Sequence, residues 1–154
     1  MHLREAVTRT VAVDGGQYSE LQVRNDRLTL TVQWYSGPAY VPSIRRLLRS
    51  RADVLVVVVD SQQERLEADE EVLAQIEAAV ASPRKPIVLQ FNKRDLPNAA
   101  PQSVLARLDR WNAPRFESTA TERKGVWEPF ETAVLIAARA RGIEAAAREL
   151  LGRR

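Results

Sequence analysis

Residues 53 to 60 read DVLVVVVD, and residues 86 to 91 read PIVLQF. Each is a short, continuous run of apolar residues rich in β-branched side chains, the pattern of a parallel strand that is buried on both faces. Segments with the pattern of helices lie between and after these runs. Helices that alternate with such strands predict an α/β fold, with DVLVVVVD at the centre of a mostly parallel sheet.

The chain before these runs has the pattern of an antiparallel meander. Strands are predicted at 8–13, 20–24 and 27–34, because β-branched residues recur there and the last of these segments alternates. DGGQ at 14–17 and RNDR at 24–27 supply turn residues between them, and Asp-Gly is a common hairpin dipeptide. An antiparallel N-terminal edge on the sheet is therefore expected.

The second half of the chain predicts further helices and strands. Ser61 is expected to cap a helix over 62–81, with Glu64 completing a capping box. The remaining expected elements are a helix over 102–112, a strand over 114–118 and a final helix over 126–150 that bends near Gly142. A chain of 154 residues is long enough for one domain and too short for two, so one domain over 1–154 is expected.

The composition excludes several kinds of site. Cysteine is absent, which excludes disulfides, thiolate catalysis and sulfur-based zinc sites, and His2 near the terminus is the only histidine. We expect no catalytic residue and no metal site. The longest apolar run, Val54 to Val59, is far shorter than the roughly 20 residues that cross a bilayer, and MHLREAVTRT lacks the apolar core of a signal peptide. A cytoplasmic protein without a membrane segment is expected.

FNKRDLP at 91–97 contains Asn-Lys-x-Asp directly after an apolar strand. The carboxylate of Asp95 can accept hydrogen bonds from the N1 and N2 edge of guanine, which adenine cannot offer, and the stem of Lys93 can cover the ring. Ala120, at the end of the next strand, can offer its N–H to the base oxygen. The predicted guanine-binding residues are Asn92, Lys93, Asp95, Ser118, Thr119 and Ala120. Alternatively, Asn92 and Asp95 only satisfy the donors of a turn and a helix cap.

The stretch ADVLVVVVDSQQERLEADEEVL, followed by KPIVLQFNKRDLP, resembles the bacterial Ras-like small GTPases of the gliding-motility (MglA) type. The resemblance implies a Ras-like, P-loop-NTPase-type three-layer sandwich. That family begins with a strand, a G-x-x-x-x-G-K-[ST] phosphate loop and a helix, and no Gly-Lys-Ser or Gly-Lys-Thr occurs here. We therefore expect a partial domain without the first strand and the P-loop. The strands at 27–34 and 53–60 then either pair directly, which we expect, or leave an open edge.

The same resemblance implies switch-like positions in the N-terminal half. Thr10 matches the switch threonine and Gly37 the glycine of the second switch. Pro38 stands where the family places the glutamine that orients the attacking water, and Trp34 where most Ras-like proteins place a magnesium-binding aspartate; neither residue can do that chemistry. The partner surface expected by resemblance comprises Thr10, Trp34, Tyr35, Gly37, Pro38 and Tyr40, and its expected partner is a roadblock-domain regulator or a polarity protein.

These features favour a degenerate GTPase, or pseudo-GTPase, that acts as a protein-interaction module in cell polarity or signalling. No cofactor is firmly expected, and GTP or GDP with magnesium is expected only if the missing N-terminal part is supplied. A second interpretation is a truncated product of an active GTP-hydrolysing gliding-motility-type GTPase.

A third interpretation is a basic nucleic-acid-binding module that uses Arg45, Arg46, Arg49 and Arg51. It is disfavoured because the net charge is only +3 and the charges are mixed along the chain. The same arginines are typical of the solvated face of a helix.

Overall fold

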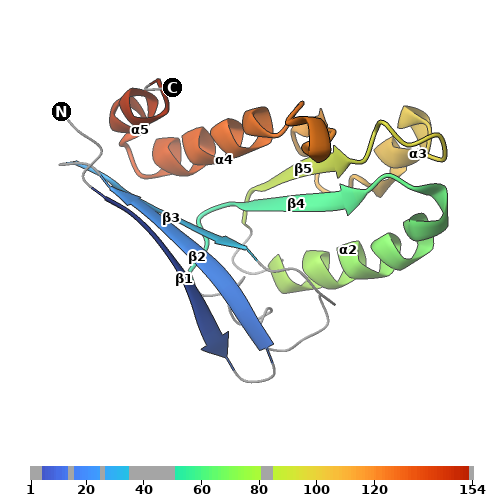
Figure 1. Cartoon of the computed structure of the whole chain (residues 1–154), viewed down its shortest axis with the longest axis horizontal. Helices are drawn as coiled ribbons and strands as arrows, with labels where there is room; N and C mark the ends of the chain where they lie inside the picture. Colours follow the sequence, from blue (N-terminus) through green and yellow to red (C-terminus); the bar gives the residue numbers. More distant parts are fainter. Residues whose placement is uncertain (1–4, 14–15, 25–26, 35–50, 81–84, 153–154) are drawn as a thin grey trace.

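The computed structural model describes residues 5–13, 16–24, 27–34, 51–80 and 85–152. Their strands form an antiparallel sheet and a parallel sheet, each with three strands (Figure 1). The predicted α/β fold class, with a parallel sheet and an antiparallel N-terminal part, is confirmed. The predictions for 35–50, which include the arginine cluster at 45–49, lie outside the described residues.

The antiparallel sheet has the order β1-β2-β3 and consists of β1 (Glu5–Val13), β2 (Gly16–Arg24) and β3 (Thr29–Trp34). Pairing between β1 and β2 extends to Val13 and Gly16, which confirms the predicted hairpin. β1 and β2 begin earlier than predicted, because backbone pairing does not depend on side-chain type, whereas β3 begins two residues later, at Thr29.

One cross-strand row of this sheet is polar, and its middle residue, Glu20, is buried. Arg9 lies opposite Glu20, and Glu20 lies opposite Gln33. The Glu20 side chain is only 3% exposed, and its carboxylate accepts hydrogen bonds from Gln33 Nε2 at 2.6 Å and from Arg9 Nε at 2.9 Å. Gln22 Nε2 donates a further bond at 3.0 Å. The bond from Gln33 is the main reason why the pKa of Glu20 lies below its usual value, against the opposing effect of burial.

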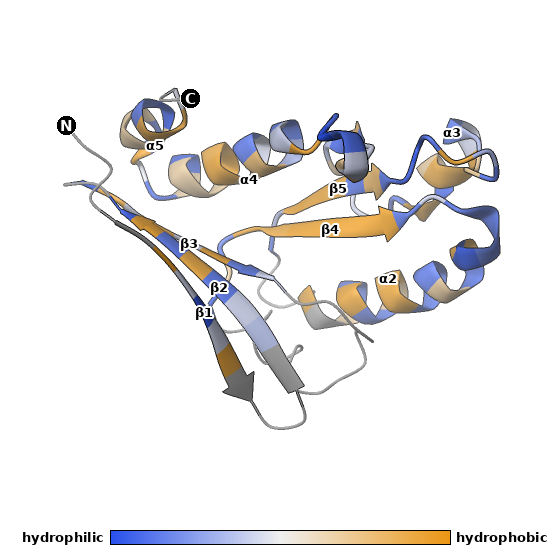
Figure 2. Ribbon diagram, in the orientation of Figure 1, coloured by the Kyte–Doolittle hydropathy of each residue, from blue (hydrophilic) through white to orange (hydrophobic). Residues whose placement is uncertain are grey.

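The parallel sheet has the order β4-β5-β6 and consists of β4 (Leu55–Asp60), β5 (Ile87–Asn92) and β6 (Arg115–Glu117). Helix α2 (Leu66–Val80) covers one face and α4 (Trp127–Ala140) lies along the other (Figure 1). β4 and β5 consist mostly of hydrophobic residues, and α2 carries both hydrophobic and hydrophilic residues (Figure 2). The main buried cluster is Leu55, Val59, Leu73, Ile76, Val80, Ile87, Leu89, Phe91, Ala100, Leu105 and Leu108.

The position predicted for DVLVVVVD at the sheet centre, buried on both faces, is wrong for the described residues. β5 is the central strand of its sheet, and β4 lies at the edge. Leu55 and Val59 are buried toward α2, whereas Val56 and Val58 on the opposite face are 38% and 58% exposed. A continuous apolar run is the same in sequence whether one face or both faces are covered, so the pattern did not distinguish the two.

Direct pairing of the strands at 27–34 and 53–60 is also wrong, since β3 and β4 belong to different sheets. Of the two alternatives, the described part of the chain has the open edge. The antiparallel sheet is attached instead through Leu28 and Leu30, which pack against a cluster on the last two helices. The buried members of that cluster are Val134, Ala138, Ala147 and Leu151.

The start of α2 differs from the predicted cap. Ser61 Oγ is fully buried and has no hydrogen-bond partner among the described residues. The Ser61 N–H donates to Asn92 O at 3.0 Å and the Gln63 N–H to Asn98 O at 3.1 Å, so these groups are not available to a capping box. A short 3-10 turn, η1 (Gln63–Arg65), then leads into α2. Asp60 Oδ1 accepts the N–H of Gln62 at 3.1 Å, a side-chain turn just before η1.

The C-terminal helices are shorter than predicted. The final helix is not bent but broken into α4 and α5 (Glu144–Leu151), with Gly142 between them at φ +69°. The N–H of Ile143 donates to Ala138 O at 2.9 Å, which closes a Schellman C-cap. Helix α3 (Gln102–Leu105) continues only as the 3-10 turn η2 (Ala106–Leu108), because Asp109 Oδ1 accepts from Trp111 N at 3.0 Å and ends it.

Candidate functional site

The carboxyl ends of β5 and β6 bring the predicted guanine-binding residues together. Asn92 Oδ1 accepts the hydroxyl of Ser118 at 3.1 Å and the N–H of Ala120 at 3.0 Å. The loop after β6 is thus fixed to the end of β5, as expected for the shared edge of parallel strands.

Ser118 and Thr119 are buried, at 3% and 8% exposed. The Ser118 hydroxyl also accepts from Gln90 Nε2 at 2.9 Å. The Ser118 side chain therefore holds the loop in place, and the buried side chains of both residues do not line an open surface. The N–H of Ala120 is already engaged by Asn92, so a base oxygen at this donor has to share or displace that bond.

Lys93 is held across the end of β4. Its Nζ lies 2.7 Å from Asp60 Oδ2 and 3.0 Å from Gln62 Oε1. Sequence reasoning missed Asp60 and Gln62 as its partners. The available signal was the register of parallel strands: Asp60 ends one apolar run as Asn92 ends the next, and the two residues are paired.

Asp95 is exposed, and its carboxylate makes no hydrogen bond or ion pair with the described residues. Asn92, by contrast, satisfies donors of the neighbouring loop. The alternative interpretation of the motif as a turn and cap therefore fits Asn92 and does not fit Asp95. A solvent-facing carboxylate beside a fixed loop has its acceptor oxygens available for a ligand.

The loop after β6 is closed by backbone bonds and by glycine. Thr119 and Lys124 form an antiparallel bridge, and Gly125 follows at φ +63°. A Cβ at Gly125 would lie 1.9 Å from the carbonyl oxygen of Glu117, so the chain passes this strand at a distance that only glycine allows. Sequence reasoning missed Gly125, which sits in no motif.

The switch-like residues are described only in part. Thr10 lies opposite Ser19 and Ser19 opposite Trp34, so Thr10 and Trp34 share one face of the antiparallel sheet. Trp34 is 46% exposed at the end of β3. Tyr35, Gly37, Pro38 and Tyr40 lie outside the described residues.

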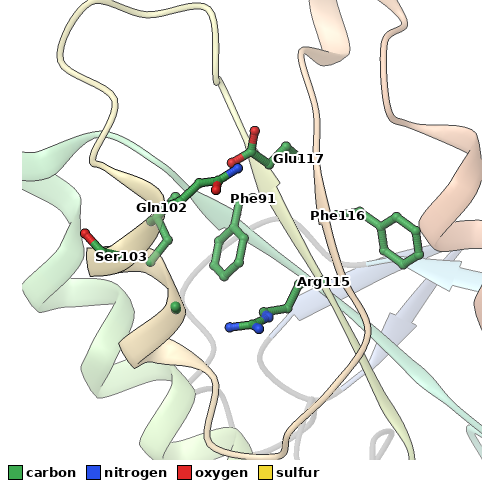
Figure 3. A pocket seen from close by; sticks show the side chains of 8 residues that line it. Phe91, Gln102, Ser103, Arg115, Phe116 and Glu117 are labelled. Carbon is green, nitrogen blue, oxygen red and sulfur yellow. The ribbon is translucent and has the colours of Figure 1, made fainter.

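A cavity of about 370 Å³ lies between α3 and the strands β5 and β6 (Figure 3). Phe91, Gln102, Ser103, Leu105, Ala106, Arg115, Phe116 and Glu117 line it. Phe116 points away from the other labelled side chains (Figure 3). None of the predicted guanine-binding residues lines this cavity, so it is not part of the candidate site.

The described residues contain no cluster of metal-ligating side chains. Among them, no group of three or more His, Asp or Glu side chains could hold a metal. Asp60, the carboxylate nearest the Asn-Lys-x-Asp loop on β4, is paired with Lys93. No helix in the described ranges is long and apolar enough to cross a membrane.

The chain is similar in sequence to a known protein. No protein-family model matches the chain. The chain is 30% identical over 129 residues to the mutual gliding-motility protein MglA of Myxococcus xanthus (strain DK1622), an alignment that covers 80% of this chain and 66% of the relative. The chain thus spans slightly less than two thirds of the length of that protein.

Proposed function

Because this chain is a Ras-like small-GTPase relative of the gliding-motility (MglA) type, we propose that it is a pseudo-GTPase. In this proposal it keeps a weak guanine-recognition loop and acts in the cytoplasm as a protein-interaction module in cell polarity or signalling. The observation that carries the proposal is Asp95, whose carboxylate is exposed and accepts no hydrogen bond from the described residues, beside a loop fixed by Asn92; its charge acts on nearby Lys124 only through space.

The chemistry at this loop favours guanine over adenine. Asp95 offers two acceptor oxygens to the N1 and N2 hydrogens of guanine, and adenine carries no such pair of donors on that edge. Lys93 adds an aliphatic stem that can lie against a flat ring.

The expected affinity is low. Two charge-assisted hydrogen bonds contribute about 1.5 to 3 kcal/mol each, whereas association costs about 4 to 15 kcal/mol in lost freedom. A dissociation constant of about 1 mM or weaker follows, since that constant corresponds to about −4 kcal/mol. Phosphoryl transfer depends on charge neutralisation around the phosphates, and the sequence has no G-x-x-x-x-G-K-[ST] loop to supply it.

Asp95→Asn should abolish the preference for guanosine over adenosine and create a preference for xanthosine. An asparagine amide donates a hydrogen where the carboxylate accepts one, and xanthosine carries an oxygen where guanosine carries its 2-amino group. Two-dimensional NMR titration of the purified chain measures these weak affinities. Glu67→Gln, an exposed charge removal on α2, is the control and should leave the preference unchanged.

Two results would contradict the proposal. Equal binding of guanosine and adenosine to the wild-type chain would remove the role of Asp95. Micromolar binding of GTP with magnesium in calorimetry would instead show a complete nucleotide site.

A protein partner is proposed for the face that carries Thr10 and Trp34. Trp34→Ala should weaken binding of a purified roadblock-domain regulator by about 30-fold, because exposed tryptophans are frequent interface hot spots worth about 2 kcal/mol or more. Surface plasmon resonance measures the change. Val7→Ala is the matched control, since Val7 is 42% exposed on the other face of the same sheet. Equal losses from both variants would argue against this face.

The second candidate is that the chain is part of an active GTP-hydrolysing GTPase. Its support is the coverage of only 66% of the relative, together with the open edge between β3 and β4. Translation of the DNA upstream of the first codon tests it, because an in-frame strand and phosphate loop would favour this candidate over the pseudo-GTPase.

A further inference from the structure

Lys93 has an unusual backbone conformation for a residue with a side chain. Its φ is +64°, in the left-handed region that glycine favours. Residues kept in this region by their surroundings are frequent at binding sites, where the strain fixes the direction of a side chain. The backbone conformation of Lys93 therefore sets the direction in which its side chain leaves the end of β5.

The Lys93 ammonium is held by oxygens from the end of β4. Asp60 Oδ2 accepts from Nζ at 2.7 Å and Gln62 Oε1 at 3.0 Å. Asp60 is itself fixed, because its other oxygen accepts the N–H of Gln62 at 3.1 Å. Its side chain is 23% exposed, compared with 46% for Lys93. The lysine charge is thus engaged at a partly shielded carboxylate.

This arrangement separates the two parts of the lysine side chain. Asp60 and Asn92 are register partners, so Lys93 reaches back over the end of the neighbouring strand. The methylene stem spans the space between these strand ends, while the charge is neutralised at β4. A stem in this place can contact a flat base, but an engaged ammonium attracts phosphate weakly.

We propose that Asp60 is a positioning residue that ties the Lys93 ammonium to β4 and presents its stem to a guanine base. The site then distinguishes between bases and not between phosphorylation states, so its ligand class includes guanine nucleosides and nucleotides alike. This inference rests on the proposed function, in which Asp95 reads the base.

The ion pair is tested first without any ligand. The chain has only three lysines, Lys85, Lys93 and Lys124, so mass spectrometry can follow the acetylation rate of each under limiting reagent. Asp60→Asn should raise the rate at Lys93 several-fold and leave the other two rates unchanged. Glu67→Gln should change none of them. An unchanged rate at Lys93 in Asp60→Asn overturns the inference.

Ligand selectivity is tested next by NMR titration with guanosine, GMP and GDP. The wild-type chain should bind all three within about twofold, because the charge of Lys93 is already paired with Asp60. Asp60→Asn should weaken guanosine binding and raise the ratio of GDP to guanosine affinity by about fivefold, the effect of one released charge at close range in water. The gain for GDP should fall at high salt. A merely structural role of Asp60 would lower all three affinities and leave the ratio unchanged.

Two further variants complete the test. In a Lys93→Met background, Asp60→Asn should no longer change the affinity ratio, since there is no charge to release. Gln62→Leu removes the second acceptor of Lys93 and should act in the same direction as Asp60→Asn, which covers the case that Asp60→Asn does not fold. A ratio that neither Asp60→Asn nor Gln62→Leu alters overturns the inference even where guanosine binding is confirmed. If the wild-type chain shows no preference for guanosine over adenosine, the proposed function fails and the inference falls with it, and the acetylation rates then report on the ion pair alone.

Discussion

Gly125→Ala should destabilise the protein by about 2 to 5 kcal/mol and lower its Tm by about 10 °C. The residue has φ +63°, where a side chain costs about 1 to 2 kcal/mol. The added Cβ would also lie 1.9 Å from the backbone oxygen of Glu117, so β6 or the following loop has to move. Thermal unfolding followed by circular dichroism measures the change.

Gly142→Ala is the matched control for this prediction. Gly142 has a similar φ of +69°, but a Cβ there would meet no heavy atom within 4 Å. Only the conformational cost remains, about 1 kcal/mol. Equal losses of stability in the two variants would show that close packing against β6 contributes nothing.

Glu20→Gln should destabilise the protein by about 2 to 3 kcal/mol at neutral pH. The Glu20 side chain is buried, with 3% of its surface exposed, and its carboxylate accepts hydrogen bonds from Arg9, Gln22 and Gln33. A glutamine at this position would point its NH₂ group at one of these hydrogen-bond donors and leave both unsatisfied. Chemical unfolding in urea measures the difference. Glu77→Gln serves as the control. Glu77 lies on α2 and forms an exposed ion pair with Arg110, so its loss should lower the free energy of unfolding by less than about 1 kcal/mol.

The Glu20 effect should depend on pH in a defined direction. Its pKa is lowered in the folded protein, chiefly by the hydrogen bond from Gln33, so the unfolded chain binds a proton more readily than the folded one. The stabilisation is therefore complete above the ordinary glutamate pKa and is lost as the pH falls through the lowered folded value. The wild-type and Glu20→Gln unfolding curves should converge in acid, and a constant gap down to low pH would contradict this assignment.

Most of the helices and strands could be predicted from the sequence, and so could the proximity of the loops that follow β5 and β6. Strands with parallel patterns end at a common edge, so Asn92 and Ser118 had to lie near each other once both strands were recognised. The residue types of Asn-Lys-x-Asp indicated that a ligand of this loop would be bound through hydrogen bonds and charge. These inferences depend on local pattern and on topology, both of which are visible in a single chain.

The remaining features depend on contacts that are distant in sequence. Lys93 and Asp60 are 33 residues apart, and their pairing requires the strand register. Gly125 is essential only because the carbonyl of Glu117 passes beside it. The exposure of Val58 depends on which elements pack against β4, and an apolar run in the sequence does not show whether one face or both faces of the strand are packed. The predicted cap at Ser61 does not form because the N–H groups of Ser61 and Gln63 donate to Asn92 and Asn98, which are distant in sequence.

The attachment of the antiparallel sheet through Leu28 and Leu30 has a consequence for folding. The strands β1 to β3 pair only with their neighbours in sequence, so they close by local hairpins, whereas β4 and β5 need the α2 crossover before they can pair. An early meander and a slower parallel layer are then two cooperative units joined by a small apolar contact. Their amide hydrogens should exchange with solvent in two separate steps, with the parallel layer protected for longer.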